Sequence, residues 1–486
     1  MRKLPTPRTT RRQFLSNFAA AIPALALGGK TSQRNMLSGA PPEAGGSGSA
    51  AGNNGRGLLN NRFLTFATIV RVNQIEVVRG KGIGVDETAA HTPETIAAFR
   101  NAFAQGWPGG SMTWALSWLA LTNTSEQYKG IRKLVAEYHE RYGDEVTFIP
   151  GGYFANAYSR REQVNRDLHD GIALASAVVG AGYRPKCVIA GFLAAENQRF
   201  LAEHEGIHVC QGNIWSQFAV DNQDGDGSIC YPYYPSTEHF CKPAQGKSDF
   251  IDCVNLDGWT VDFLAARRPG NAGGFNSRMG VGPIETVHGD WKSRGLEEMV
   301  FTTAIHFDQG FELNGFGWIA NNWEIVIGTD GLTDWLSAVK RRWPDALSIP
   351  HGEFGLRWRE HFQDNSRLNY RFIERGSGIG GSDIDKEIHW FMNQEFRLAL
   401  LRDLPGPTPE EVIDFTRYDL RAQEPQGMTR KWSLMGEINQ KQTRPQDKPR
   451  PLKELSADDR KRIAKIYPEL LARSSRPCFL GRSSPS

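Results

Sequence analysis

The amino-acid sequence predicts an α/β protein, namely a seven-stranded (β/α) barrel followed by a small C-terminal antiparallel β domain. From Arg62 onward, apolar runs alternate with amphipathic helices, and seven strand and helix pairs fit before residue 365. Such runs are typical of parallel strands that are buried on both faces. Beyond Leu368 the apolar period changes to two, which indicates antiparallel strands. No G-x-G-x-x-G segment follows the first strand, so a dinucleotide-binding sheet is not favoured.

The predicted barrel domain, residues 62–365, can be followed strand by strand. Its strand-like runs are RFLTFATIVRV, SMTWALSWLAL, EVTFIPGGYF, CVIAGFL, IHVCQGNIW, GFGWIANNWEI and ALSIPHGEFG. Pro and acidic residues mark helix starts. The expected helices begin at Thr92-Pro93-Glu94 or cover residues 125–142, 159–179, 296–308 and 332–343, with one more after CVIAGFL. A long connection rich in Gly, Pro, Tyr and Asp follows Trp215, and a connection of that length is usually functional.

The predicted C-terminal domain covers residues 366–486 and includes a polar tail. Its runs with a period of two are NYRFIER, EIHWFMNQEFRLALLRD and EVIDFTRYDL. The glycines of residues 376–381 lie between strand-like runs with no helix after them, so they predict a turn and not a phosphate loop. Residues 439–453 are polar and Pro-rich, and SADDRKRIAKIYPELLA predicts a last helix.

The N-terminus predicts a twin-arginine signal peptide over residues 1–35 and a disordered linker over residues 36–61. Basic residues up to Arg12 precede a short apolar stretch, and Arg11-Arg12 resembles the twin-arginine motif. We therefore expect a periplasmic or secreted protein, with the twin-arginine export machinery as a partner. The apolar stretch is too short to span a bilayer, so the mature chain should have no integral membrane segment.

Overall composition is that of an ordinary globular protein. The 57 Lys and Arg residues nearly balance 54 Asp and Glu residues, for a net charge of +3, and this balance does not indicate a nucleic-acid partner. The six cysteines form no C-x-x-C pair, so neither a zinc ribbon nor a disulfide-rich scaffold is predicted. Three of them share the long connection, where an oxidising compartment would permit a bridge: Cys230, Cys241 and Cys253.

Several runs carry a resemblance to a known family. They are WALSWLALT, EVTFIPGGYFAN, FLAAENQRFLAEHEGIHVCQGNIWSQ, YPYYPSTEHFCKPAQG, NLDGWTVDFLAARRPG and HGEFGLRWR. Together they resemble a secreted bacterial glycoside hydrolase/deacetylase family, in which a barrel domain of unknown function precedes a small second one (3863 and 3864). The resemblance extends from about Arg62 to Ser456 and implies a barrel similar to those of certain glycosidases and polysaccharide deacetylases. Because one fold hosts many reactions, the site has to be predicted from the residues.

Two carboxylates follow predicted barrel strands and form the leading catalytic pair. Glu196 ends the fourth strand and Glu353 the last, and a glycosidase needs one protonated and one ionised carboxyl group. Asp257 or Asp262, beside Trp259, could replace either partner. The alternatives are structural, because Glu196 could serve only the dipole of its helix, and the two aspartates could pair with neighbouring arginines.

Further residues near predicted strand ends are expected to bind a carbohydrate substrate. Sugar rings stack on aromatic side chains, and amides and imidazoles bind hydroxyl groups. The predicted substrate-binding residues are Trp114, Tyr153, Asn197, Asn213, Trp215, Trp259, Asn322, Trp323 and His351. For each tryptophan, a place in the core is the structural alternative.

A deacetylase would instead need a divalent metal, and this is the only cofactor that the sequence raises. Asp86-Glu87 with His91 is the nearest ligand set, and His239 or His288 could complete it. The segment DNQDGDG, residues 221–227, lacks EF-hand spacing and predicts a polar turn.

Three functions therefore stand as hypotheses: a secreted hydrolase of glycosidic bonds, a metal-dependent sugar deacetylase, and a non-catalytic glycan-binding protein. The first predicts that Glu196 and Glu353 face each other at the mouth of the barrel and that at least one is buried. A separation of ~5 Å would indicate a retaining mechanism, and ~6.5 to 9.5 Å an inverting one.

Overall fold

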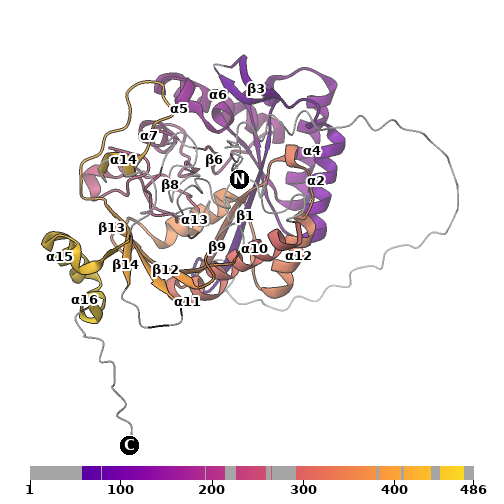
Figure 1. The fold of residues 1–486 in the computed structure, drawn as a ribbon. Helices are drawn as coiled ribbons and strands as arrows, with labels where there is room; N and C mark the ends of the chain where they lie inside the picture. The colour runs from indigo at the N-terminus through magenta and orange to yellow at the C-terminus, as the bar shows by residue number, and fades with distance from the viewer. Residues whose placement is uncertain are drawn as a thin grey trace, which may run out of the picture. The chain divides into compact units, whose positions relative to one another are not determined.

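The computed structural model describes most of the chain from Gly57 to Ser474 (Figure 1). Residues not described within that range are 78, 192, 214–225, 259–263, 265–291, 379–381, 405, 407–409 and 439–448. The predicted signal peptide and nearly all of the predicted linker lie outside the described residues, and so do Trp215, Trp259 and Asp262.

A parallel sheet forms the centre of the molecule, with β1 (Arg62–Val70) as its longest strand. Eight of the nine residues of β1 are buried, as expected for a strand covered on both faces. The strands that pair with β1 in parallel are β4 (Thr113–Leu116), β9 (Gly317–Asn322) and β10 (Leu347–Ser348). β5 (Glu145–Phe148) pairs with β4.

A second parallel sheet consists of three short strands, whose bounds are β6 (Val188–Ile189), β7 (Val209–Gln211) and β8 (Val254–Asn255). The predicted mixed α/β architecture with parallel strands is therefore correct. The pairing among the described residues forms sheets of five and three strands, and does not establish a closed barrel of seven. β8 lies inside the long connection, where no strand was predicted.

Helices cover the parallel strands, and they overlap the predicted helices, although α10 begins before the predicted residue 296. They include α2 (Pro93–Gly106), α4 (Glu126–Tyr142), α6 (Arg161–Val179), α7 (Ala195–Glu203), α10 (Lys292–Ala304) and α12 (Leu332–Arg342). Thr92 and Thr95 form a capping box at the start of α2, and the Ser125 hydroxyl caps α4. Figure 1 shows α2, α4 and α12 along one side of β1.

Two local features differ from the prediction. The hairpin of β2 (Asn73–Val77) and β3 (Lys81–Asp86) was not predicted, because its residues do not alternate clearly. The run ALSIPHGEFG is a strand only at Leu347–Ser348, and from His351 it is α13 (His351–His361). Glu353 therefore lies in the first turn of a helix and not at a strand end.

The predicted C-terminal antiparallel sheet is confirmed. Its strands, in sheet order, are β11 (Asn369–Arg375), β12 (Lys386–Asn393), β13 (Phe396–Asp403), β14 (Glu411–Arg417) and β15 (Arg450–Pro451). The described part of the glycine-rich segment, at Gly376 to Gly378, lies in the connection between β11 and β12.

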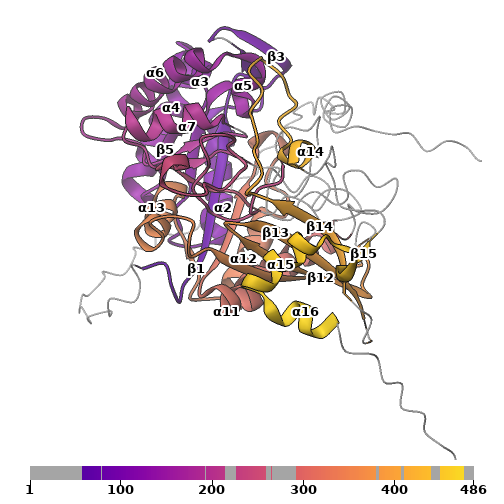
Figure 2. The ribbon, with the colours of Figure 1, turned by 90° about the vertical axis from the view of Figure 1, so that its left-hand side faces the viewer.

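Both faces of this antiparallel sheet are covered. Along β13, Ala399 and Leu401 belong to the core shared with the parallel sheet, whereas Phe396, Leu398 and Leu400 belong to a second apolar cluster. Helices α15 (Ala457–Ile466) and α16 (Pro468–Ser474) contribute Ile463, Tyr467 and Leu470 to the second cluster. Figure 2 shows these two helices beside β12 to β14. One core thus joins the C-terminal sheet to the parallel strands.

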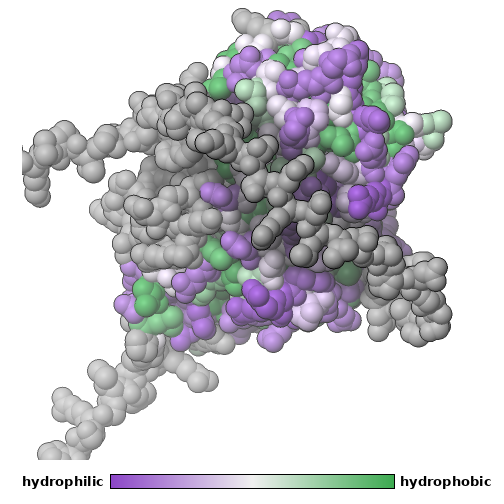
Figure 3. Space-filling view, turned by 90° about the vertical axis from the view of Figure 1, so that its right-hand side faces the viewer, coloured by the Kyte–Doolittle hydropathy of each residue, from purple (hydrophilic) through white to green (hydrophobic). Residues whose placement is uncertain are grey.

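None of the described helices is long and apolar enough to cross a membrane. On the face in Figure 3, hydrophilic and hydrophobic residues are interspersed over the described part of the chain. The five described cysteines are buried and none of them forms a disulfide, so this structure has no bridge between Cys230, Cys241 and Cys253.

Candidate functional site

Polar side chains gather where β7, β8 and β9 end. Asp257 follows β8, is fully buried, and accepts hydrogen bonds through Oδ2 from the Ser228 hydroxyl and, at 3.4 Å, from the Asn213 amide. Asn213 follows β7 and is also fully buried. Asn213 was predicted beside Trp215 near a strand end and Asp257 beside Trp259 in the long connection, and the structure brings these two side chains together.

The group of polar side chains at these strand ends also includes residues of β7 and β9. The Asn322 amide donates to Gln211 Oε1 at 2.9 Å, and both side chains are buried. Oδ1 of Asn321 and Oδ1 of Asn322 are buried without a hydrogen-bond partner in the described structure. Buried acceptors of this kind are rare unless a ligand or water uses them. Gln211, Asn213, Asp257, Asn321 and Asn322 are called the strand-end cluster below.

A charged network lies at the carboxyl end of β1. Arg71 binds Glu87 through two hydrogen bonds of 2.5 and 2.7 Å and Glu324 through one of 3.0 Å, and all three side chains are nearly buried. Burial disfavours ionisation of Glu87, but Arg71 and His91 outweigh it and lower its pKa to about 2. Glu324 comes two residues after Asn322, so the network adjoins the strand-end cluster along the chain.

Tyr153 occupies a strained turn after β5. Its φ is 85°, and it follows two glycines, Gly151 and Gly152, whose φ values are 62° and 59°. A Cβ on Gly152 would approach the Gln74 carbonyl to 2.7 Å, so only glycine fits there. Non-glycine residues held at positive φ cluster at functional sites. Tyr153 is buried, and its phenol lies near enough to Arg71 to act electrostatically on it.

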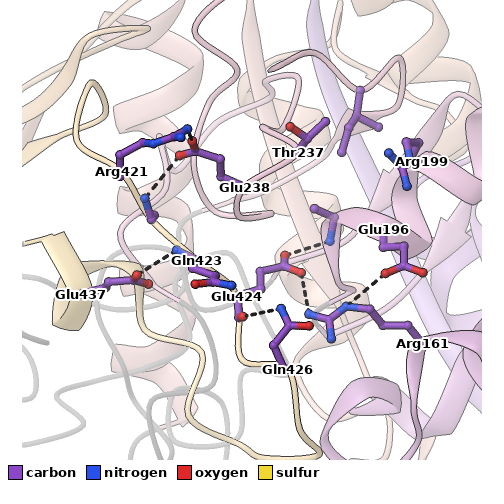
Figure 4. A pocket seen from close by; sticks show the side chains of 13 residues that line it. Arg161, Glu196, Arg199, Thr237, Glu238, Arg421, Gln423, Glu424, Gln426 and Glu437 are labelled. Atoms are coloured by element: carbon purple, nitrogen blue, oxygen red, sulfur yellow. Dashed lines mark hydrogen bonds and ion pairs between the residues drawn. The ribbon is translucent and has the colours of Figure 1, made fainter. Parts of the chain in front are cut away.

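Glu196 lines a cavity near the strand-end cluster. Figure 4 shows the cavity, which has a volume of about 560 Å³ and a lining made mostly of Glu, Arg and Gln side chains. Glu196 is in the first turn of α7, its side chain is 46% exposed, and its Oε2 lies 3.8 Å from Nε of Arg161. This is the helix-dipole environment that was the structural alternative for Glu196.

Glu353 does not share that cavity among its described lining residues. Its carboxylate pairs with Arg357, one turn later on α13, at 2.5 Å, and its side chain is 38% exposed. The expectation that at least one of Glu196 and Glu353 is buried is therefore wrong. Their joint catalytic role stays a prediction without a shared contact to support it.

Several predicted substrate-binding residues have structural roles instead. Trp114 is fully buried, donates to Asp144 at 2.9 Å and stacks on Tyr138, so it is a core residue. Trp323 is buried, and its indole donates to the Gly328 carbonyl at 2.7 Å. In this structure both tryptophans have core contacts, and their predicted contacts with substrate stay predictions.

Asn197 and His351 are also buried. Asn197 accepts from Asn156 at 2.7 Å and donates to Asn165 at 2.6 Å and to the Arg161 carbonyl at 2.9 Å, so its side chain ties α6 to α7. His351 starts α13 beside Thr113, and burial lowers its pKa to about 3. His351 thus makes a contact between strand and helix, its Nε2 is buried without a hydrogen-bond partner in the described structure, and its predicted contact with substrate stays a prediction.

The metal-ligand set Asp86, His91 and His239 is not assembled. Asp86 is exposed and accepts from the Thr88 amide, whereas His91 contacts Glu87 at 3.4 Å. His239 is buried in the long connection, where burial and then Lys242 lower its pKa to about 3. In the part of the chain that the structure describes, no three His, Cys, Asp or Glu side chains are grouped to hold a metal ion.

Comparison with known families and structures places the chain among relatives of the same architecture. Residues 56–392 match a domain of unknown function with a solved structure, DUF3863. The chain belongs to the DUF3863 family. Residues 397–470 match a second domain of unknown function, DUF3864. No curated protein matches the chain.

A crystal structure from Parabacteroides distasonis resembles this DUF3863 protein closely. It is named a "putative glycoside hydrolase/deacetylase", is 49% identical, and matches 85% of this chain and 99% of its own with a TM-score of 0.78. A GH57 branching enzyme from Thermococcus kodakaraensis matches 61% of this chain and 70% of its own at 11% identity, with a TM-score of 0.34. The boundary between the DUF3863 and DUF3864 matches falls between β12 and β13, inside one antiparallel sheet.

Proposed function

We propose that this DUF3863 protein is a carbohydrate-active hydrolase that cleaves a glycosidic bond at the strand-end cluster. The observation that carries the proposal is the buried row in which Asp257 meets Asn213 and Gln211 meets Asn322. Carboxylates and amides at the carboxyl ends of parallel strands are the usual building blocks of active sites in α/β folds. The name of the Parabacteroides distasonis relative agrees with this class of reaction.

The row also supports a barrel-like arrangement of the strands. β7 pairs with β6 and β8 and has no pairing with β9, yet Gln211 of β7 hydrogen-bonds Asn322 of β9. Side chains from alternate strands meet in this way in the interior of a barrel. We therefore retain the (β/α) barrel as part of the proposal.

The two carboxyl groups that we assign to catalysis are Asp257 and Glu324. Asp257 is fully buried, and its Oδ2 accepts from Ser228 and Asn213, so the folded protein holds its carboxyl group in a fixed position. It suits the general acid that protonates the leaving oxygen. Glu324 binds Arg71 at 3.0 Å and suits the ionised partner, which acts as nucleophile or base.

The amides of the strand-end cluster would position the sugar. The free acceptors Asn321 Oδ1 and Asn322 Oδ1 can each receive a hydroxyl hydrogen, which would replace a hydrogen bond that the folded protein does not supply. Tyr153, held by its strained turn near Arg71, is suited to contact the same sugar from β5. Asn213 would orient the carboxyl group of Asp257.

Turnover of a glycan panel tests the proposal. The wild type should hydrolyse at least one glycan, and Asp257→Asn and Glu324→Gln should each lower kcat by about 100-fold or more, as removal of a general acid or base does. Circular dichroism at the assay temperature checks that both variants are folded. Hydrolysis that survives unchanged in both folded variants would refute the assignment of these two residues.

A further inference from the structure

The 560 Å³ cavity beside the strand-end cluster is built from both family domains. On one side lie Arg161 and the first turn of α7, on another the long connection, and on the third the segment 421–437 (Figure 4). The lining residues from this third wall are Arg421, Ala422, Gln423, Glu424, Gln426 and Glu437. Residues of the DUF3864 match thus supply nearly half of the described lining.

Glu424 fixes the third wall in place. Its buried carboxylate accepts from the backbone amides of Ala195 at 2.8 Å and Phe240 at 2.9 Å, and from Arg161 at 3.0 Å. Arg161 also donates to the Pro425 carbonyl at 2.9 Å. These bonds attach the segment to the start of α7 and to the long connection, so the cavity is a fixed feature of the fold.

The backbone connects the cavity to the strand-end cluster, although no cluster residue is among the described lining residues. α7 begins directly after the segment that follows β6, and the Leu193 amide in that segment donates to the Gly212 carbonyl at 2.9 Å. Gly212 stands between Gln211 and Asn213 of the cluster. A chain of sugar units bound at the cluster could therefore extend towards the cavity.

The lining points to an uncharged ligand with many hydroxyl groups. Four carboxylates and three guanidinium groups face the cavity, and most of them are paired with each other, as Arg161 is with Glu424 and Arg421 with Glu238. A charged ligand would meet both signs of charge, whereas hydroxyl groups can both donate to carboxylates and accept from guanidinium groups. None of the described lining residues is aromatic, so recognition there would rest on hydrogen bonds.

We propose that this cavity is a second glycan-binding site, which holds a sugar unit of the substrate remote from the bond that is cleaved. The proposal rests on the proposed function at the strand-end cluster. It makes the C-terminal domain part of the substrate-binding machinery. Arg199 and Gln426 lie on different walls of the cavity in Figure 4, so they sample both sides of the proposed site. Arg199 has no hydrogen bond or ion pair to another described residue.

Arg199→Ala and Gln426→Ala test the site, with Arg166→Ala as the matched control. Arg166 is an exposed arginine on α6 that does not line the cavity. Hydrolysis of hexasaccharides and disaccharides of α-1,4-glucan, β-1,4-glucan, β-1,4-xylan and chitin would be compared. For the hexasaccharide that the wild type cleaves, each cavity variant should raise KM about fivefold, as loss of one hydrogen bond does, with kcat unchanged. The disaccharide and the control variant should show no change.

Binding to the same hexasaccharides, measured by titration calorimetry on Asp257→Asn, separates this proposal from the proposed function. If no glycan is cleaved but one binds, and Arg199→Ala or Gln426→Ala weakens that binding about fivefold, the cavity proposal holds and the hydrolase proposal fails. If hydrolysis and binding of hexasaccharides are the same in the wild type, the control and both cavity variants, the cavity proposal is overturned. Absence of any glycan binding overturns both.

Discussion

Asp226 provides a sharp test of how burial controls charge in this fold. Its carboxylate is fully buried, accepts two contacts of 2.8 Å from the Ser433 hydroxyl, and accepts from the Met435 amide at 3.0 Å. Burial raises the pKa of Asp226 from 3.8 to about 7, although these hydrogen bonds and the nearby Arg397 oppose the change. Asp226→Asn keeps the shape of the side chain and removes its charge.

The sign of the effect follows from linkage. Because the folded state holds the proton more tightly than the unfolded state does, the contribution of Asp226 to stability is fully present below pH 3.8 and is lost as the pH rises through 7. The pKa of Asp226 changes from 3.8 to about 7, and each pH unit corresponds to about 1.4 kcal/mol. The contribution of Asp226 to the free energy of unfolding is therefore at most about 4 kcal/mol. Above pH 7 the variant should therefore be more stable than the wild type, by up to this amount, whereas near pH 4 the two should be similar.

Urea unfolding followed by tryptophan fluorescence, at intervals from pH 4 to pH 8, measures this difference. Asp385→Asn, at an exposed aspartate between β11 and β12, is the control and should leave the pH dependence unchanged. A difference between Asp226→Asn and the wild type that is the same at every pH would refute the reasoning.

Three further substitutions have definite expected outcomes, each measured as the free energy of unfolding in urea. Glu424→Ala should lower the free energy of unfolding by about 3–5 kcal/mol, because it removes the partner of the largely buried Arg161 and the acceptor of two backbone amides. Glu424→Gln should lower it less. A loss below 1 kcal/mol would contradict the role of Glu424 in fixing the segment 421–437. Gly152→Ala should lower the free energy of unfolding by about 1–3 kcal/mol and should lower turnover, because the φ of 59° and the nearby Gln74 carbonyl leave no room for a Cβ. A variant as stable as the wild type would contradict the strained turn. Asp144→Ala should lose about 3–5 kcal/mol, since it leaves the buried Arg100 without its carboxylate partner, and a near-neutral effect would show that this ion pair is dispensable.

The helices were predictable because their signals are local. Thr92, Ser125 and Ser456 each cap a helix that begins at the next residue. The single last helix that was predicted is divided into α15 and α16, because Pro468 starts a new helix. The antiparallel strands were predictable because one residue in two along β11 is buried. Such periodicity is encoded in neighbouring residues, so a single sequence reveals it.

Glu353 was misplaced because the apolar run before it continues into a helix. Pro350 is the N-cap of α13 and Glu353 lies in its first turn, which is the arrangement of a helix start. The buried strand next to it, with Ile349 as its last apolar residue, concealed that signal. A Pro followed three residues later by Glu was the sequence feature that could have corrected the assignment.

The candidate site was predictable only in part, because its contacts are long-range. Asn213 and Asp257 could be named because each lies near a tryptophan, but nothing in the sequence pairs Arg71 with Glu324, 253 residues away. The role of Glu424 was also hidden, since it depends on how the C-terminal segment packs against α7. A buried charge is recognised only when its partners are known.

The most direct test of the central claim compares two carboxylates in the same assay. Asp257→Asn and Glu353→Gln each replace one carboxyl group with an amide, the first in the buried strand-end cluster and the second on the exposed first turn of α13. On the best glycan substrate of the wild type, Asp257→Asn should lower kcat by about 100-fold or more, and Glu353→Gln should retain nearly full activity. Full activity of a folded Asp257→Asn variant, with loss of activity in Glu353→Gln, would contradict the account.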